Sequence, residues 1–493
     1  MENELSTEEW KQKKKEQRAI FTARQRLPYE VKLKRQAIKA WQFYEEILSR
    51  DMNVHVSVGG LDSITLYIWL CSIGIEPHAI SISGVEDKSI QKVHRALGVE
   101  IVRSYKSKVQ VLNEVGFPVI SKKIAGRINT LQHPTENNKT VRHAIITGEC
   151  GKQGHFAKNS RMQLPKKWLE LFGGYENENE GVHYGKPDPD IPVSNECCHW
   201  LKEKPCDDWA KNHNSVPYPG MMASEGGQRE EALIDHGCNY YGKTVIRSAP
   251  FAIFMRSDIL RLALAMDRWY HDHLDFFEVK FHAQPYGRNL DGSFKEYVPL
   301  ESIVPEIYGK IVTDPIVILR TTGAQRTGCS MCGFGIHLEQ RPHRFDKLRE
   351  RNPKEWEFWM YRCCTDPKTG EKYGWGRVLD YIGLTDEEKV KAIERLKILT
   401  GNNDEKLIGV LIDEAEAFVL GYTNRTRLVT GLEKAVRDLA VIALNRLGTE
   451  GETGRSEGGE SYSFDNAPRQ IYDVLNRFRL ARVGGRTYET KAK

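Results

Sequence analysis

The segment from residue 53 to residue 102 alternates between two hydrophobic patterns, and this alternation limits the folds open to the chain. Short runs rich in Val and Ile, at 53–58, 78–83 and 99–102, predict buried strands. Apolar helical patterns at 64–73 and 89–97 separate them. Strands that alternate with helices at this spacing form parallel sheets. The sequence therefore predicts an α/β fold, a twisted parallel sheet with helices on both faces.

Length and composition predict a water-soluble chain of about two to four domains. The chain has 493 residues, of which 40% are hydrophobic and 28% charged, and its mean hydropathy is -0.53. No apolar run reaches the roughly 18 residues of a membrane span, and the N-terminus lacks the apolar segment of a signal peptide. We therefore expect a cytoplasmic protein without a membrane partner. Because thiols stay reduced there, the ten cysteines are expected to be metal ligands, catalytic groups or core residues.

Residues 1–50 are predicted to form a basic helical segment. The net charge of the chain is only +5, yet eleven Lys and Arg residues lie within the first forty positions. Apolar residues such as Phe21 and Trp41 are interleaved with them, which predicts helices with one apolar side. Two interpretations stay open: a solvated helix face, or a surface that contacts nucleic acid or another polyanion.

A change of pattern near residues 383–386 predicts a domain boundary. Beyond it the spacing of apolar residues is helical, with core stripes at intervals of three and four. Helices are predicted at 387–399, 405–420, 431–447 and 467–479. The sequence thus predicts three parts: the basic segment 1–50, an α/β domain over 51–384, and a small all-α domain over 385–493.

The turn that follows the first strand has the composition of an anion-binding loop. Gly59 and Gly60 allow close approach to a phosphate, and Ser63 can donate a hydrogen bond to it. Backbone N–H groups at the start of the following helix point toward the same place. Asp62 could cap the helix or bind a metal ion such as Mg²⁺. The alternative is a purely structural turn between strand and helix.

Two pairs of cysteines are the strongest candidates for metal ligands. Cys329 and Cys332 lie two residues apart in a Gly-rich turn, a spacing that suits zinc, a redox dithiol or an iron–sulfur cluster. Cys197 and Cys198 are adjacent. Neighbouring side chains diverge, so adjacent cysteines rarely both bind one tetrahedral zinc, whereas the separate irons of a cubane accept them more easily. Unliganded thiols are the remaining alternative.

The phosphate loop resembles that of a known superfamily. Residues 58–63 are similar to the PP-loop of the adenine-nucleotide α-hydrolase superfamily, whose pattern is Ser-Gly-Gly-Lys-Asp-Ser, and residues 84–86 to the Thr-Gly-x-Glu stretch of its phosphoadenosine phosphosulfate (PAPS) reductase branch. The resemblance covers residues 27–383 and implies a Rossmann-like PP-loop domain that binds ATP or a PAPS-like nucleotide. Val58 and Leu61 depart from the pattern, and the lysine missing at Leu61 is expected to affect ATP cleavage more than nucleotide binding. The implied nucleotide-binding residues are Gly59, Gly60, Asp62, Ser63, Gly84 and Glu86.

The cysteine arrangement is similar to that of the [4Fe–4S]-bearing members of the PAPS reductase family. This likeness implies a [4Fe–4S] cluster, with zinc as the alternative metal. The implied ligands are Cys197, Cys198, Cys329 and Cys332.

One absence argues against simple sulfonucleotide reduction. Members that reduce their substrate use a nucleophilic Cys in a C-terminal Glu-Cys-Gly-x-His stretch, and no Cys follows Cys364 here. A thiolate must attack the sulfonate sulfur, so reduction would need another cysteine. The loop also resembles the ATP-pyrophosphatase side of the superfamily, in which an acceptor is adenylylated and then substituted. The leading hypothesis is an enzyme of adenylyl-linked sulfur transfer or sulfonucleotide chemistry, with Asp62 and Ser63 as candidate catalytic residues.

Residues 385–493 resemble a second family, the head–tail connector proteins of tailed phages. The similar stretches include residues 396–401, 412–416, 422–425 and 435–448. The resemblance implies partners among phage head and tail proteins, or self-assembly into a ring, in the cytoplasm of a phage-bearing host or in the virion. The alternative to the enzyme hypothesis is a structural connector whose nucleotide domain is catalytically degenerate. A third hypothesis is that the two parts have no joint function.

Overall fold

The computed structural model consists of two compact units, residues 1–339 and 340–493, each described here by itself. The boundary predicted near residue 384 falls within the second unit, and residues 385 and 386 lie outside the described part of the chain. The structure describes residues 7–149, 162–177, 182–185, 191–313, 318–339, 343–384, 387–425, 428, 431–447, 454–457, 460–463, 469–480, 482–483 and 486–487.

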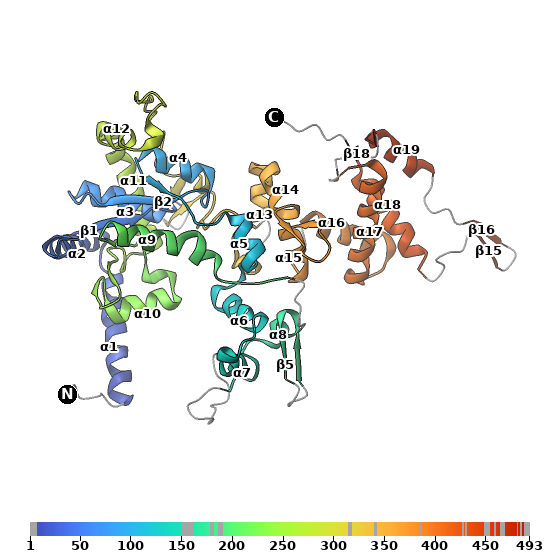
Figure 1. The fold of residues 1–493 in the computed structure, drawn as a ribbon, viewed down its shortest axis with the longest axis horizontal. Helices are drawn as coiled ribbons and strands as arrows, with labels where there is room; N and C mark the ends of the chain where they lie inside the picture. Colours follow the sequence, from blue (N-terminus) through green and yellow to red (C-terminus); the bar gives the residue numbers. More distant parts are fainter. Residues whose placement is uncertain are drawn as a thin grey trace. The chain divides into compact units, whose positions relative to one another are not determined.

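A four-stranded parallel sheet forms the centre of the first unit (Figure 1). Its strands, in spatial order, are β3 (Glu100–Val102), β2 (His78–Ile82), β1 (Asn53–Ser57) and β7 (Ser215–Pro217). The first three confirm the predicted strands and their parallel direction. The strand β7, which pairs with β1 through Val54 and Val216, has no counterpart in the sequence prediction. It is three residues long and ends in a proline, and prolines are confined to sheet edges.

Helices cover both faces of this sheet. Along β1, Val54 and Val56 belong to the core that also contains α2 (Tyr29–Ser49) and α3 (Leu61–Ser72). His55 contacts Trp209 of α9 (Lys204–Asn212) instead. Successive side chains of a strand point to opposite faces, so α9 covers the face opposite to α2 and α3. The α/β architecture predicted from the alternation of strands and helices is confirmed.

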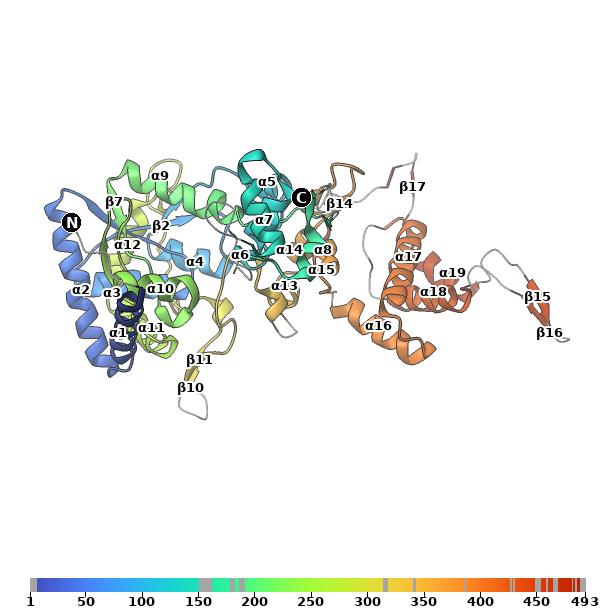
Figure 2. The ribbon, with the colours of Figure 1, turned by 90° about the horizontal axis from the view of Figure 1, so that it is seen from below.

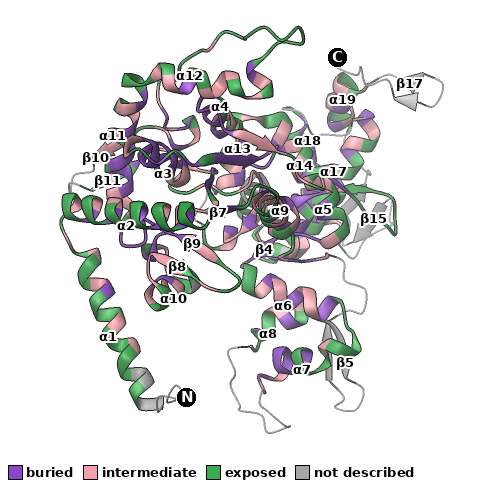
Figure 3. Cartoon of the chain, turned by 60° about the vertical axis from the view of Figure 1, so that its left-hand side comes forward, coloured by how far each residue is buried: buried purple, intermediate pink, exposed green. Residues whose placement is uncertain are grey.

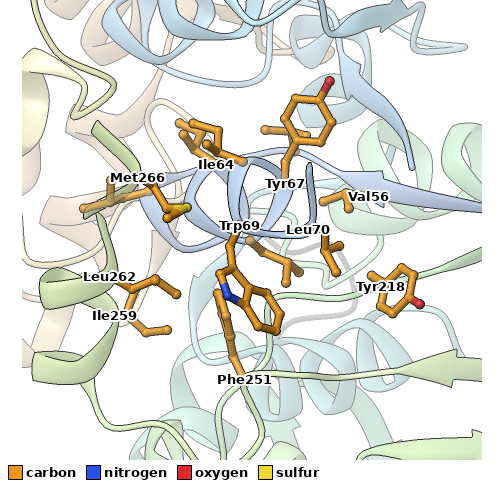
Figure 4. Packing of buried hydrophobic residues seen from close by; sticks show 14 of the residues in the cluster. Val56, Ile64, Tyr67, Trp69, Leu70, Tyr218, Phe251, Ile259, Leu262 and Met266 are labelled. Atoms are coloured by element: carbon orange, nitrogen blue, oxygen red, sulfur yellow. The ribbon is translucent and has the colours of Figure 1, made fainter. Parts of the chain in front are cut away.

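The helix α3 is apolar on all sides because it lies between the sheet and α11 (Arg256–Asp272). Figure 4 shows Trp69 of α3 beside Phe251, and their ring centroids are 5.6 Å apart. On another side of the helix, Met266 of α11 lies beside Ile64. Each fully buried side chain of this size contributes about 1.5–3 kcal/mol to folding. This packing holds the first turn of α3, which carries the glycine loop, in a fixed place.

The remaining elements of the first unit surround this core. Two more helices pack near the sheet, α4 (Lys88–Ala96) and α12 (Leu274–Ala283). The other helices are α1 (Thr7–Gln25), α5 (Lys108–Val115), α6 (Lys122–Gln132), α7 (Lys139–Thr147), α8 (Lys166–Phe172) and α10 (Gly227–His236). The other strands are β4 (Val119–Ile120), β5 (Gly174–Asn177), β6 (Val182–Gly185), β8 (Asn239–Tyr241), β9 (Ile246–Ser248), β10 (Ile311–Thr313), β11 (Leu319–Thr321) and β12 (Gly333–Phe334). Short helical turns are η1 (Glu136–Asn138), η3 (His199–Glu203), η4 (Ala223–Glu225), η5 (Pro285–Gly287), η6 (Glu306–Tyr308) and η7 (Ile336–Leu338).

The strand pair β4–β12 joins two distant parts of the first unit. The strand β12 begins directly after Cys332 and pairs in parallel with β4 through Phe334 and Ile120. The Gly335 N–H donates a hydrogen bond of 2.7 Å to the Ile120 carbonyl. These bonds anchor the turn that contains Cys329 and Cys332.

The second unit is mainly helical, and its helices beyond residue 386 lie close to the predicted ranges. A first group comprises α13 (Arg344–Arg351), α14 (Pro353–Tyr361), α15 (Trp375–Tyr381) and the hairpin of β13 (Cys364–Thr365) and β14 (Lys372–Tyr373). A second group comprises α16 (Glu387–Thr400), α17 (Glu405–Thr423), α18 (Glu433–Asn445) and α19 (Arg469–Phe478) around one hydrophobic core. Figure 2 shows these helices in orange and red. Two short hairpins accompany them, so the all-α description holds only for the core: β15 (Gly454–Glu457) with β16 (Glu460–Ser463), and β17 (Arg482–Val483) with β18 (Arg486–Thr487).

Stability of the first unit is expected to depend on pH through His55. This side chain is only 2% exposed and lies 2.8 Å, through Nδ1, from the Ser215 hydroxyl. Burial, followed by repulsion from His78 and His213, lowers its pKa from 6.5 to about 4. The unfolded chain therefore binds more protons between these values, and the stability contributed by the neutral ring is fully present above pH 6.5 and lost as the pH falls toward 4.

Between pH 7 and about pH 4.5 this group is expected to lower the free energy of unfolding by about 2 kcal/mol. Urea unfolding of the full chain, followed through hydrogen exchange of β1 amides, measures the change. The His55→Gln variant cannot gain the charge, so its pH dependence should be shallower by that amount. Equal pH dependence in the two proteins would contradict the assignment to His55.

Candidate nucleotide and cysteine site

The glycine loop lies where the order of the sheet reverses. The strands β2 and β3 lie on one side of β1 and β7 on the other, and the loop follows the carboxyl end of β1. Ligands of open parallel sheets bind at such a switch point. The segment after β7 also reaches the loop, because a Cβ added at Gly220 would lie 3.5 Å from the Asp62 backbone.

Hydrogen bonds within the loop fix its shape. The Gly59 N–H donates to the Ser63 hydroxyl over 2.7 Å, and this hydroxyl donates to the Gly60 carbonyl over 2.9 Å. The His94 Nε2 lies 2.7 Å from the Gly59 carbonyl. Burial lowers the pKa of His94 and the Gly59 carbonyl opposes the shift, so the neutral ring donates this bond. Ser63 therefore stabilises the turn itself, in addition to being a candidate donor to a phosphate.

Gly60 is required by the close approach of two hydroxyl groups. The Leu61 N–H donates over 3.0 Å to the hydroxyl of Tyr308, which in turn lies 2.5 Å from the Thr327 hydroxyl. A Cβ at Gly60 would lie 2.7 Å from the Thr327 oxygen and closer still to that of Tyr308. A residue with a side chain would displace both groups.

Asp62 forms an ion pair with Arg256, the first residue of α11. Arg256 also donates to the Gln325 carbonyl over 2.9 Å. Burial raises the pKa of Asp62, and the Arg256 guanidinium opposes this shift. Asp62 lies in the first turn of α3, and its carboxylate pairs there with the Arg256 guanidinium. The cation beside Asp62 was not identified from the sequence.

Glu86 and Lys202 form a second ion pair beside the loop. Glu86 is 6% exposed, and its Oε1 lies 2.5 Å from the Lys202 Nζ. The same oxygen would lie 3.4 Å from a Cβ at Gly59. Gly84, two residues before Glu86, has a positive φ of 69°, the left-handed region that favours glycine. The structure thus brings the predicted residue Glu86 to the glycine loop, and Gly84 lies in the turn that precedes it.

The two cysteine pairs also come together. Cys197 and Cys198 immediately precede the π-helical turn η3, and Cys329 lies with them in one hydrophobic cluster that includes Val85 and Leu201. In the turn of Cys329 and Cys332, Met331 has a positive φ of 54°, and the Cys332 N–H donates to the Cys329 carbonyl over 3.1 Å. The Ser330 N–H donates over 2.9 Å to the carbonyl of Val85, the neighbour of Glu86.

The thiols influence each other's ionisation. A hydrogen bond with Cys198, together with burial and the nearby Cys332 and Cys329, raises the pKa of Cys197. The hydrogen bond from Cys197 and the neighbouring Lys122 lower the pKa of Cys198 to about 6. Burial raises the pKa of Cys329 to about 11, against the effect of Lys202. These effects require the four sulfur atoms to be neighbours.

A metal centre on the four cysteines stays a prediction. Over the described ranges, no group of three or more His, Cys, Asp or Glu side chains is arranged to hold a metal ion. Cys197, Cys198 and Cys329 lie in one apolar cluster, with Lys122 and Lys202 close by, and thiolates are the ligands that iron–sulfur clusters use. The residues that would hold such a cluster are Cys197, Cys198, Cys329 and Cys332.

Lys202 connects the two halves of the site. Burial opposes its charged form, but Cys329 and Glu86 together raise its pKa above the ordinary lysine value. The Lys202 ammonium group therefore interacts both with Cys329 and with the Glu86 carboxylate beside the glycine loop. Lys202 was not predicted, although its place four residues after Cys198 on a helical turn was a usable signal.

The other described cysteines have no comparable surroundings. Cys71 and Cys238 are core thiols whose pKa values burial raises to about 12 and about 11. Cys206 lies near the cluster, with its Sγ 3.8 Å from the Ser57 hydroxyl. Cys363 and Cys364 belong to the second unit, with sulfur atoms 3.8 Å apart.

The basic N-terminal segment forms α1 and α2, and its charge is only partly on the surface. Residues Lys13, Lys15 and Arg18 of α1 are exposed, as Figure 3 shows for most of this helix. Lys32 is 3% exposed and forms an ion pair with Asp258. A contact between α1 and nucleic acid stays a prediction.

Comparisons with known proteins bear on the second unit. Among the described residues, no helix is both long and apolar enough to cross a membrane. Neither the search of curated proteins nor that of solved structures found a significant match to this chain. Residues 390–479, which comprise most of α16 and all of α17, α18 and α19, match the family described as phage gp6-like head-tail connector protein, so this part of the chain is a connector-type domain.

Proposed function

We propose that the first unit binds the phosphates of an adenine nucleotide at the loop of Gly59, Gly60, Asp62 and Ser63, beside an iron–sulfur cluster on the four cysteines. The observation that carries this proposal is the bridge of Glu86, Lys202 and Cys329 between the loop and the thiols. The reaction class that suits both halves is adenylyl-linked sulfur transfer or sulfonucleotide chemistry, as in PP-loop enzymes of the PAPS reductase type.

The charges around the loop support phosphate binding without the lysine that Leu61 replaces. Arg256 forms an ion pair with Asp62, and Lys202 forms one with Glu86. Both cations are paired with a carboxylate, which holds them in place near the loop and keeps the local net charge low. A nucleotide phosphate would compete with these carboxylates for the cations, or would bring Mg²⁺ to Asp62.

The two halves would have separate tasks. A bound cluster would supply electrons or sulfur for the reaction. The chain itself would orient the nucleotide through the N–H groups at the start of α3. The Ser63 hydroxyl would turn from the Gly60 carbonyl to donate to a phosphate oxygen. The buried, apolar surroundings of Cys197 and Leu201 would exclude water from the sulfur.

An ATP titration tests the phosphate site. The full chain, purified without oxygen, is expected to bind ATP and to bind adenosine far more weakly, because adenosine lacks the groups that the loop contacts. Isothermal titration calorimetry with both ligands gives the comparison. Equal affinity for ATP and adenosine, or no binding of ATP, would overturn the proposal for this loop.

A second candidate function, assembly into a connector ring, is favoured by the family match over residues 390–479. Connector-type domains assemble through helix faces, and α16 has two large apolar side chains in the solvent: Ile398 is 81% and Leu399 67% exposed. Neighbouring Leu396 is fully buried in the core of the domain. In this role the partners are copies of the chain and phage head or tail proteins, in the host cytoplasm or the virion.

Replacing Ile398 and Leu399 together by lysine is expected to shift the full chain from a ring to a monomer. Two charges on an apolar interface remove its hydrophobic contribution and repel their copies around the ring. Mass photometry at micromolar concentration measures the assembly, and Arg395→Ala on the same helix is the matched control. A native chain that remains monomeric would sink the ring assignment and leave the nucleotide site untouched.

A further inference from the structure

The start of α3 is capped by a side chain from a remote part of the chain. Gly60, the cap residue, has no side chain of its own to accept an N–H. The Tyr308 hydroxyl accepts the Leu61 N–H instead, from 247 residues along the chain. Tyr308 is 3% exposed, and burial raises its pKa, so the hydroxyl is neutral.

The two hydroxyl oxygens occupy the space that Gly60 leaves free. Tyr308 and Thr327 lie so close that any side chain at Gly60 would overlap with them. A phosphate oxygen bound at this position would accept the Leu61 N–H, as the tyrosine oxygen does. The tyrosine hydroxyl therefore stands where the proposed ligand would bind.

Backbone hydrogen bonds join the segment of Tyr308 to the segment that leads to Thr327. The Gly323 N–H donates to the Tyr308 carbonyl over 2.8 Å, and the Ala324 N–H donates to the Ile307 carbonyl over 2.9 Å. Thr327 continues the same segment and lies two residues before Cys329. Hydrogen bonds and chain continuity thus connect Tyr308 with the cysteine turn.

We infer that Tyr308 is a built-in competitor of the nucleotide phosphate and closes the glycine loop until a ligand oxygen replaces its hydroxyl. This inference rests on the proposed nucleotide function and adds its regulation: the loop opens only at the cost of the Leu61–Tyr308 hydrogen bond. Thr327 stabilises the closed form by holding the hydroxyl in place.

The Tyr308→Phe variant of the full chain tests this directly. Without the hydroxyl, the Leu61 N–H is open to a phosphate, and ATP is expected to bind about fivefold more tightly, the equivalent of one net hydrogen bond. Adenosine affinity should stay unchanged. Without any ligand, the Leu61 amide should exchange its hydrogen faster than in the native chain.

The matched control is Tyr286→Phe. This hydroxyl likewise bonds to the backbone, but it donates to the Val99 carbonyl over 2.8 Å, just before the start of β3. The Tyr286→Phe variant should leave the ATP affinity and the hydrogen exchange of the Leu61 amide unchanged. ATP binding that is equal or weaker in Tyr308→Phe than in the native chain overturns the inference and leaves the nucleotide proposal standing. If neither the native chain nor Tyr308→Phe binds ATP, the nucleotide proposal itself is overturned. The proposed competition then fails with it, even if the Leu61 amide exchanges faster.

Discussion

The Lys202→Met variant is expected to lower the free energy of unfolding of the first unit by about 2 kcal/mol and to weaken ATP binding about tenfold. Removing the lysine leaves the buried carboxylate of Glu86, 6% exposed, without its cation. Breaking a fully buried ion pair costs about 3–5 kcal/mol. The Lys202 side chain is 34% exposed, so water screens part of this cost.

Two further variants test whether the unpaired charge of Glu86 causes the loss of stability. In the double variant Glu86→Gln/Lys202→Met no charge is left unpaired, so most of the lost stability should return while ATP binding stays weak. Lys204→Met is the matched control, because its ion pair with Asp208 lies on the surface with side chains 39% and 28% exposed. Surface pairs contribute about 0–1 kcal/mol. Chemical unfolding and ATP titration measure both properties, and equal stability of Lys202→Met and Lys204→Met would contradict the bridge.

The Cys329→Ser variant is expected to retain less than about a tenth of the iron of the native chain after anaerobic purification. The serine hydroxyl stays protonated at neutral pH and is a poor substitute for a thiolate ligand. Cys329 also interacts with Lys202, so the variant should weaken ATP binding as well. Iron analysis and visible absorption follow the cluster, and calorimetry follows ATP.

Cys238→Ser controls for the loss of a buried thiol. Cys238 donates to the Ala249 carbonyl over 3.1 Å, a contact that serine can keep, and it belongs to neither half of the proposed site. This variant should keep its iron. Iron contents that are equal in Cys329→Ser and the native chain would exclude Cys329 as a ligand.

The sequence predicts the parts of the fold that depend on local patterns. The strands β1, β2 and β3 and the helices α3 and α4 follow from runs of Val and Ile and from apolar periodicity. In the second unit, α16–α18 follow from stripes at helical spacing. The strand β7 was not predicted because Ser215–Pro217 is too short to form a hydrophobic pattern. Only its pairing with β1 makes it a strand.

The candidate site divides in the same way. The glycines, Asp62 and the four cysteines are recognisable from motifs within a few residues. Their partners lie far along the chain: Arg256 is 194 residues from Asp62, Lys202 is 116 from Glu86, and Tyr308 is 247 from Leu61. Such pairs are set by tertiary packing, and among these partners only Lys202 had a local signal, its place four residues after Cys198.

The iron–sulfur cluster that we propose beside the glycine loop can be tested without any variant. The most direct measurement is elemental analysis of the full chain purified without oxygen, for iron, acid-labile sulfide and zinc. We expect iron and sulfide in equal amounts, about four of each per chain, and no stoichiometric zinc. Zinc at about one per chain, without iron or sulfide, would contradict it.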